Sequence, residues 1–406
     1  MHNRNSKVFV IDGSRTPIGS FGKSLRGLPV EKLASHSMTH ALRKSGVEPG
    51  QLDGVVLGHG YQSSYAPNTA RVAALEAGIS PTVHGMTVQR QCGSGMEAIH
   101  DAARMILLGE ADLMLAGGAE SMSTIPYMLP GSARWNGFIA KKLKIVKMGP
   151  RPTLFALLDN GLAPMKLIKD TKTVYMAMTA QRLADTYGIS REAADEYALR
   201  SQQLAAEAIK NGRFAMEIDA IQVPGRGFFI NDEHPRKTSI EALSKLKGVL
   251  GTRDITAGNS SGINDGACMV TVASDRKVAE LGVEPLVQLV DWAVVGLDPD
   301  QMGLGPVGAI NRVLANTGLS LADIDLIEIN EAFAAQYLAC EKLLGLDRDK
   351  VNVNGGAVAM GHPIGMTGAR ILLSLGYELK RRNLKRGIAS LCIGGGMGIA
   401  TLVERP

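Results

Sequence analysis

The sequence predicts an α/β protein, and three observations support this. Short apolar runs rich in β-branched residues alternate with segments of helical periodicity over much of the 406 residues, as expected for a sheet covered by helices. The 47 glycines indicate many tight turns and close backbone approaches. With 45% hydrophobic and 20% charged residues, the chain has a globular composition and is long enough for more than one domain.

Strands and helices alternate in the first part of the chain. Apolar runs predict strands at 7–12, 52–59 and 111–118, and periodic segments predict helices at 30–45 and 68–78. After residue 251 the alternation returns. There the pattern predicts strands at 266–274, 284–296 and 324–330, a helix at 331–344, and a final glycine-rich helix and strand pair.

The stretch 122–250 departs from this alternation and is interpreted as an inserted, loop-rich subdomain. It is rich in proline and carries a basic run at 134–151. One long helix is predicted at 191–211, because Ser190 is a suitable N-cap and Gly212 a suitable residue just after the helix end.

A weak internal similarity suggests two related halves. CGSG, a helix and ADLMLAGGAESM in the first half resemble HPIGMTGARILLSLG and RGIASLCIGGGMG in the second. We expect one half at 1–121 together with 251–280 and the other at 281–406, each placing a helix start and a glycine turn at a shared centre. The alternative is a chance similarity between two βα units.

Charge and cysteine content narrow the classes of function. Forty-four Lys and Arg against 39 Asp and Glu give a net charge of +5. This charge favours an anionic small molecule as the ligand, and the sequence lacks the dense basic patches of nucleic-acid binders. The four cysteines form no CxxC pair, and no His cluster has zinc spacing, so we expect no metal site. Without a secretory signal or a long apolar run, a cytoplasmic protein with reduced thiols is expected.

Cys92 is the first candidate catalytic residue. It stands in QCGSG, directly before the helical pattern MEAIHDAARMILLG. A helix N-terminus lowers a thiol pKa and favours the nucleophilic thiolate, and the glycines allow a thioester to approach. Taken alone, Cys92 is more simply interpreted as a small buried core residue.

Three further side chains stand in similar glycine-rich frames. His362, in GHPIGMTG before another helix, can act as a base for a thiol. Cys392, in SLCIGGGMG, is expected at a strand end, half exposed, as a general acid and base. Asn330, in NEAF, can orient a water or polarise a carbonyl. The simpler alternatives are a helix-capping histidine, an inert cysteine and a helix N-cap asparagine.

Together these segments closely resemble the thiolase family over essentially the whole chain, with SRTPIGSFGKSL, GGAESMS, AGNSSGINDGA and MGLGPVGA adding to the match. The resemblance implies a five-layered αβαβα thiolase fold of two similar halves with an inserted loop domain. It implies that Cys92 is acylated, that His362 activates it and that Cys392 moves the proton. It also implies one oxyanion hole from His362 and an Asn330-bound water, and another from the N–H groups of Cys92 and Gly394.

The resemblance further implies coenzyme A contacts at Ser261, Arg236, Met176, Ala257 and Phe333. The alternative for Ser261 and Arg236 is an ordinary turn serine and a solvated arginine. The chain departs from short-chain members at Tyr175-Met176-Ala177, where they commonly have His-Met-Gly. The basic stretch 134–173 resembles the loop of subunits from fatty-acid oxidation complexes, and is expected to bind a partner subunit or a membrane surface, or to be simply solvated.

The activity implied is that of an acyl-CoA:CoA C-acyltransferase: reversible condensation of acetyl-CoA with acyl-CoA, or thiolytic cleavage of a 3-ketoacyl-CoA, within fatty-acid metabolism. Acetyl-CoA, acyl-CoA and CoA are the expected partners, with coenzyme A a substrate and no metal or redox cofactor. A homodimer or homotetramer is expected. The alternatives are a decarboxylating condensing enzyme of the same superfold and a catalytically idle lipid carrier or scaffold.

Overall fold

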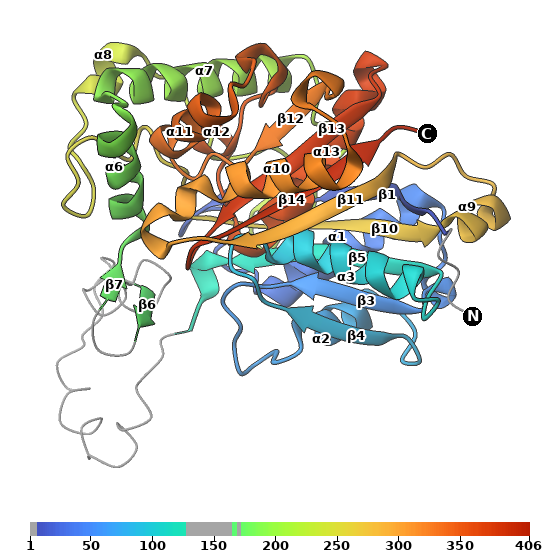
Figure 1. Cartoon of the computed structure of the whole chain (residues 1–406). Coiled ribbons are helices and arrows are strands. Elements are labelled where there is room, and N and C mark those ends of the chain that lie inside the picture. The colour runs from blue at the N-terminus through green and yellow to red at the C-terminus, as the bar shows by residue number, and fades with distance from the viewer. Residues whose placement is uncertain (1–5, 127–164, 169–171) are drawn as a thin grey trace.

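The computed structural model describes residues 6–126, 165–168 and 172–406 (Figure 1). The strands are β1 (Val8–Arg15), β2 (Gly19–Ser20), β3 (Gly54–Gly58), β4 (His84–Val88), β5 (Leu113–Ser121), β6 (Met165–Ile168), β7 (Lys172–Val174), β8 (Ile221–Val223), β9 (Gly227–Phe229), β10 (Asn264–Ser274), β11 (Val287–Gly296), β12 (Leu326–Ile329), β13 (Arg386–Ile393) and β14 (Met397–Glu404). Ten form one mixed sheet in the order β12-β13-β14-β11-β1-β10-β5-β3-β4, with β2 paired to β10.

The α-helices fall into an inner pair and outer groups. They are α1 (Val30–Ser45), α2 (Thr69–Glu76), α3 (Ser94–Leu107), α6 (Met176–Tyr187), α7 (Arg191–Lys210), α8 (Ile240–Ser244), α9 (Asp275–Leu281), α10 (Gly305–Thr317), α11 (Ala334–Leu344), α12 (Ala357–Met360) and α13 (Ile364–Arg382). α13 packs on α3 and touches strands of both halves, β5 and β10 on one side and β12 and β13 on the other. α1 covers the opposite face of the first half, and α10 that of the second.

This arrangement gives five layers: α1 with α2, the first half of the sheet, α3 with α13, the second half of the sheet, and α10. The α/β prediction and the αβαβα order are therefore confirmed. In Figure 1 the blue to cyan half lies below the orange to red half, with α6 and α7 beside the latter. β10 lies between β1 and β5, so residues from both sides of the inserted stretch build the first half, although the proposed domain boundaries themselves stay a prediction.

The predicted helix ends agree with the structure in most places. Ser190 accepts a hydrogen bond from the N–H of Ala193 at the start of α7, and Gly212 follows its end with a φ of 67°. The exception is the helix expected from residue 331, because α11 begins only at Ala334 and its N-cap residue Phe333 is extended. Its residues are held instead by pairing to the 259–261 loop, through Ser261 N–H to Ala332 O and Ala334 N–H to Asn259 O.

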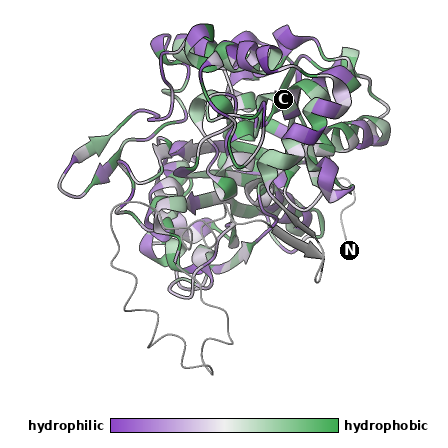
Figure 2. Ribbon diagram, turned by 90° about the vertical axis from the view of Figure 1, so that its left-hand side faces the viewer, coloured by the Kyte–Doolittle hydropathy of each residue, from purple (hydrophilic) through white to green (hydrophobic). Residues whose placement is uncertain are grey.

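The apolar residues gather where the layers meet. Figure 2 shows hydrophobic colouring concentrated in the central strands and hydrophilic colouring on the outer helices. The largest buried cluster includes Met96 and Ile99 of α3 and Leu372 and Leu375 of α13. Burial of this kind is the main favourable term in folding, so the inner pair of helices also forms the centre of the core.

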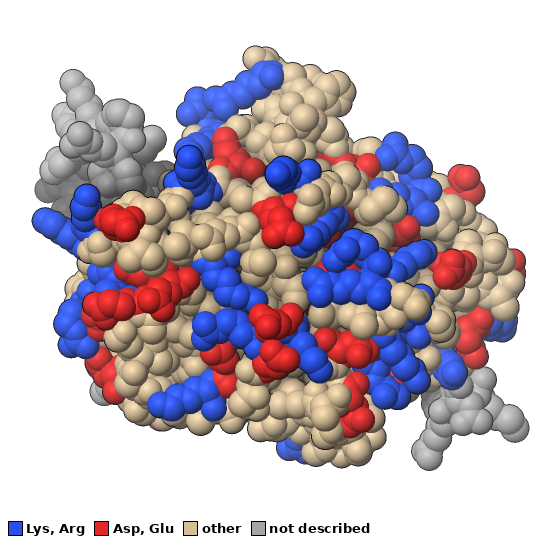
Figure 3. All heavy atoms as spheres, turned by 90° about the horizontal axis from the view of Figure 1, so that it is seen from above, with Lys and Arg blue, Asp and Glu red and all other residues tan. Residues whose placement is uncertain are grey.

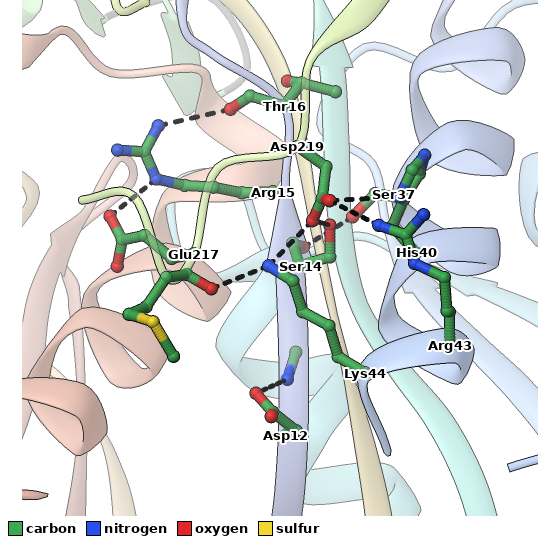
Figure 4. A network of polar contacts seen from close by, with 12 residues as sticks. Asp12, Ser14, Arg15, Thr16, Ser37, His40, Arg43, Lys44, Glu217 and Asp219 are labelled. Atoms are coloured by element: carbon green, nitrogen blue, oxygen red, sulfur yellow. Dashed lines mark hydrogen bonds and ion pairs between the residues drawn. The ribbon is translucent and has the colours of Figure 1, made fainter. Parts of the chain in front are cut away.

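A buried charge network attaches the inserted region to β1. The Arg15 N–H donates to Glu217 O and the Asp219 N–H donates to Arg15 O. The Arg15 side chain, fully buried, pairs with Glu217 and Asp232 at 2.7 Å each. Asp219 accepts from Ser14 and pairs with basic side chains of α1, as Figure 4 shows; these are His40, Arg43 and Lys44. Because each buried charge has a partner, breaking one pair would leave the other charge uncompensated.

The starts of α3 and α13 approach the sheet more closely than any side chain would allow. A Cβ on Gly118 of β5 would lie 1.9 Å from the Gly365 carbonyl oxygen of α13, and one on Gly58 of β3 would lie 2.2 Å from the Ser94 carbonyl carbon of α3. These contacts are with backbone, which cannot move aside as a flexible side chain can. Glycine at these positions thus lets both helix starts reach the same point of the sheet.

We predict that Gly118→Ala lowers the melting temperature of the protein, because the added methyl group forces α13 away from β5. Overpacking of this kind typically costs about 1–3 kcal/mol. Gly27→Ala is the matched control, since a Cβ there meets nothing within 4 Å. Thermal unfolding followed by circular dichroism measures both variants, and equal melting temperatures would show that the close approach does not matter.

Candidate active site

One cavity of about 660 Å³ collects nearly all the residues singled out in the sequence. Cys92, His362, Cys392 and Gly394 line it, from segments far apart in the chain. All five expected coenzyme A contacts line it too; they are Ser261, Arg236, Met176, Ala257 and Phe333. The remaining candidate, Asn330, is not among the lining residues.

Cys92 lies two residues before α3, in a loop of unusual backbone geometry. Gln91 has a φ of 45°, a region that residues other than glycine seldom occupy. The Ser94 hydroxyl stabilises the turn by accepting from the Arg90 N–H and donating to Gln91 O. This loop presents the partly exposed Cys92 side chain to the cavity.

The pKa of Cys92 does not follow the expectation from sequence. Burial raises it to about 11, although the nearby backbone N–H groups of Gly394 and of Cys92 itself act to lower it. The expected low pKa is therefore wrong, because desolvation outweighs the helix start. Gly394 and Cys92 are therefore close to each other in the cavity lining.

His362 is held with one ring nitrogen free. Its Nδ1 lies 2.6 Å from the Thr367 hydroxyl oxygen, and that hydroxyl donates its only hydrogen to Pro363 O at 2.8 Å. Nδ1 must therefore be the donor, which leaves Nε2 as the unprotonated nitrogen. Nε2 is buried without a partner among the described residues. Burial lowers the pKa of His362 to about 3, so the ring is a neutral base.

Cys392 and Gly394 belong to the hairpin between β13 and β14. Cys392 is next to the last residue of β13 and is 1% exposed. The expectation of a half-exposed thiol is wrong, because Met302 and Ala332 pack over it. Burial and the neighbouring Cys92 both raise its pKa well above the usual thiol range. The resting site thus contains two neutral thiols and one neutral imidazole.

Asn330 lies just behind the cavity wall. It directly follows β12, and its N–H donates to Ser390 O on the strand that carries Cys392. Its side chain is 1% exposed, and neither amide atom has a hydrogen-bond partner among the described residues. The helix N-cap alternative is wrong, since Phe333 is the N-cap of α11. A buried, unsatisfied amide is costly, which is consistent with a polar partner such as the expected water.

The outer part of the cavity has a basic edge. Arg236 donates to Ala257 O at 2.9 Å and contacts His234 Nε2 at 3.3 Å. Burial, with Arg236 and Lys23 nearby, lowers the pKa of His234 to about 4, so Arg236 carries the charge of this pair. Tyr175, Met176 and Ala177 all line the cavity, which puts the departure from the short-chain pattern at the binding site.

Several supporting residues were not predicted from the sequence. Thr367 orients His362, and the Asn264 side chain accepts from the His362 N–H at 3.0 Å. Glu331, fully buried, accepts from Tyr197, Ser201 and Asn352 and so joins NEAF to α7. Glu120 accepts the N–H of Gly365 in α13. Thr367, Asn264, Glu331 and Glu120 all stand inside sequence motifs that support the family resemblance, but only their tertiary contacts reveal their roles.

The basic stretch 134–173, predicted to bind a partner or a membrane surface, lies outside the described residues except for β6 and the start of β7. Among the described residues, no group of three His, Cys, Asp or Glu could hold a metal ion. No helix in the described part of the chain is long and apolar enough to cross a membrane.

Family models and curated relatives match along the whole chain. A model described as "Thiolase, N-terminal domain" matches residues 8–276, and one described as "Thiolase, C-terminal domain" matches residues 283–405. A protein named acetyl-CoA acetyltransferase from Syntrophomonas wolfei is 42% identical over 98% of this chain and 99% of its own. One of the same name from Cupriavidus necator is 43% identical over 98% and 99%.

Solved structures agree. The crystal structure of the Bacillus anthracis acetyl-CoA acetyltransferase superposes with a TM-score of 0.91 at 45% identity, covering 100% of both chains. That of human mitochondrial 3-ketoacyl-CoA thiolase in complex with CoA gives 0.89 at 40% identity, covering 99% of this chain and 98% of that one. None of these relatives is described as a decarboxylating condensing enzyme or a lipid carrier.

We predict that iodoacetamide modifies Cys92 before Cys268 and Cys340, because those two are fully buried. Only the thiolate reacts, so with a pKa of about 11 the rate at Cys92 should rise about tenfold per pH unit through pH 7 to 10. Peptide mass mapping at several pH values measures it. A rate that levels off near neutral pH would instead support the thiolate expected from the helix start.

Proposed function

Since the chain belongs to the thiolase family and is an acyltransferase, we propose that Cys92 carries the acyl group in reversible exchange between acetyl-CoA, acyl-CoA and 3-ketoacyl-CoA. The observation that supports this most is the single cavity that holds Cys92, His362 and Cys392. In one direction the enzyme condenses acetyl-CoA with an acyl group on Cys92. In the other, it cleaves a 3-ketoacyl-CoA with CoA, by the same two-step covalent cycle.

In the proposed first step, the Cys92 thiol gives its proton to His362 Nε2 while the sulfur attacks the carbonyl of the acyl group, which is the thioester carbonyl of acyl-CoA or the 3-keto carbonyl of 3-ketoacyl-CoA. The orientation of Nε2 as the unprotonated nitrogen supports this direction of transfer. The adduct then expels CoA as a thiolate, or acetyl-CoA as its enolate, and the leaving group takes a proton from Cys392. The backbone N–H groups of Cys92 and Gly394, which act on the sulfur, are proposed to receive the oxyanion that forms beside it. Each such donor is worth about 2.7–4 kcal/mol in comparable sites.

In the proposed second step, Cys392 exchanges a proton with the alpha carbon of acetyl-CoA or with the incoming CoA thiol. Its position beside Cys92 in the shared cavity supports this division of labour. Asn330, with an unsatisfied amide behind the wall, is proposed to hold the water that completes a second oxyanion hole with His362. The chemistry is acyl transfer between thiols and needs no metal or redox cofactor, and coenzyme A is a substrate.

We propose that coenzyme A lies along the outer part of the cavity, against Ser261, Ala257, Met176 and Phe333. Arg236 at the basic edge suits a phosphate, because guanidinium binds phosphate oxygens well. The relatives bear two activity names, acetyl-CoA acetyltransferase and 3-ketoacyl-CoA thiolase. Tyr175-Met176-Ala177 in the cavity wall favours the broader of the two. Comparing acetoacetyl-CoA with C8 and C16 3-ketoacyl-CoA substrates separates them.

The wider setting is also proposed. Thiolytic cleavage of 3-ketoacyl-CoA would place the enzyme in fatty-acid metabolism and β-oxidation in the cytoplasm, as a homodimer or homotetramer. The basic stretch 134–173 would supply a contact for an oxidation-complex partner subunit. Nucleic acid is not proposed as a partner, because the net charge is only +5. On the one face that Figure 3 shows, basic and acidic side chains are interspersed.

We predict that Cys92→Ala abolishes thiolysis of acetoacetyl-CoA by CoA, because no acyl group can be carried. Cys392→Ala should still form acetyl-Cys92 on addition of acetyl-CoA but fail to form or cleave carbon-carbon bonds. Loss of thioester absorbance and intact-protein mass measure the two properties. Cys340→Ala is the control, because Cys340 lies outside the cavity lining. An active Cys92→Ala variant would refute the proposed function.

We predict that Thr367→Val lowers kcat at least about tenfold, since a well-placed general base contributes about 10²–10⁴-fold. The variant leaves His362 Nδ1–H without its acceptor and frees the ring to turn or change tautomer. KM for CoA should change little, because Thr367 does not line the cavity. Thr367→Ser keeps the hydroxyl and should retain activity. Equal kcat for the Val and Ser variants would contradict the orienting role.

A further inference from the structure

Glu120, in β5, is fully buried and lies outside the cavity lining. Its Oε2 accepts the N–H groups of Gly60 and Gly365, each at 3.0 Å, and its Oε1 accepts that of Tyr61 at 3.3 Å. Gly365 belongs to the first turn of α13, whose own N-cap, Pro363, supplies no side-chain hydrogen bond. Glu120 therefore caps, from the first half of the molecule, the helix start that follows His362.

His59 completes the arrangement with a defined tautomer. Its Nδ1 lies 2.9 Å from the Thr69 hydroxyl, which donates its hydrogen to Ala66 O, so Nδ1 must be a donor. Nε2 then faces Glu120 Oε1 at 3.2 Å, with both side chains at most 3% exposed. This contact is attractive only with a proton between the two atoms. The pair thus holds one proton there and is neutral overall.

The pair also lies beside the nucleophile. Burial raises the pKa of the Tyr61 hydroxyl, and Cys92 and Glu120 are both close enough to add to this rise when ionised. Gly60 has no room for a Cβ, which would lie 2.7 Å from Glu120 Oε2 and 2.9 Å from Ile364 Cγ2 of α13. The 59–61 turn is therefore packed between Glu120 and the start of α13, next to the Cys92 loop.

From this geometry we infer that Glu120 and His59 are positioning residues for acyl transfer, which hold the helix start carrying His362 in register with the loop carrying Cys92. The inference rests on the proposed function for the reaction it serves. It concerns residues that do not touch substrate, and they act through Gly365 and the 59–61 turn.

Removing one or the other charge of the Glu120–His59 pair should change the pKa of Cys92 in opposite directions. The groups that face Glu120 are His59 and Tyr61 after β3, Cys92 before α3, and Asp265 on β10. Burial and the Glu120 charge raise the pKa of the Cys92 thiol. Removing the carboxylate charge should favour the thiolate. Removing the imidazolium charge should disfavour it, because a carboxylate without its partner then lies beside the sulfur.

The test is the pH dependence of Cys92 alkylation by iodoacetamide. Glu120→Gln preserves the shape and can donate to a neutral His59, and it should shift the profile to lower pH, because Glu120 raises the Cys92 pKa. His59→Gln keeps an N–H donor without a charge and should shift the profile to higher pH. Asp101→Asn, on α3 but paired with Arg104, is the control and should leave it unchanged. Shifts in the same direction, or none, would overturn the inference.

Turnover supplies the second readout. Glu120→Ala leaves three N–H groups without an acceptor, so kcat should fall more than about tenfold with KM for CoA unchanged, and Glu120→Gln should recover most of it. Equal kcat for all three proteins would overturn the inference.

If Glu120→Ala does not fold, the two Gln variants decide. Alkylation needs no thioester, so opposite shifts in an enzyme that cannot cleave acetoacetyl-CoA would refute the proposed function and leave the pair's effect on Cys92 intact.

Discussion

The contact of two helix starts with the sheet at glycine is the constraint on which the rest of the structure depends. Gly118 and Gly58 allow the backbone of α13 and α3 to touch β5 and β3 at distances that any Cβ would prevent. Cys92 and His362, which precede these helices, therefore reach the same cavity although 270 residues of sequence separate them. The wider αβαβα arrangement follows, because an inner helix pair that touches both halves must be covered by sheet on each side.

Close backbone packing also sets the electrostatics of the cavity. Burial raises the pKa of Cys92 to about 11 and lowers that of His362 to about 3. Both shifts favour neutral groups, so the resting site carries neither thiolate nor imidazolium. Negative charge becomes favourable only where N–H donors converge, at the Cys92 and Gly394 amides. A site of this kind is suited to stabilising charge that develops on substrate rather than charge stored on the protein.

Cys92, His362, Cys392 and Gly394 all line one cavity. The sequence indicated the first three through their glycine-rich frames next to helix starts or a strand end, and Gly394 only through the resemblance to the family. It predicted poorly what depends on tertiary surroundings. The acidity of Cys92, the burial of Cys392 and the late start of α11 arise from segments that pack over these residues. Glu120 and Thr367 gave no signal, since a carboxylate or hydroxyl shows its role only through the groups it meets.

The glycines that bring the helices together leave backbone N–H groups at the helix starts without side-chain acceptors, and buried carboxylates from other elements accept some of them. Neither α3 nor α13 has a side-chain cap at its N-cap residue, because these residues are Gly93 and Pro363. The free N–H groups must nevertheless be satisfied, since burial removes water. Glu120 does this for Gly365, and Glu331 accepts the N–H of Val358 in the segment that leads to His362. Both carboxylates come from neighbouring elements, so the same bonds that satisfy the backbone also fix the catalytic segments relative to one another.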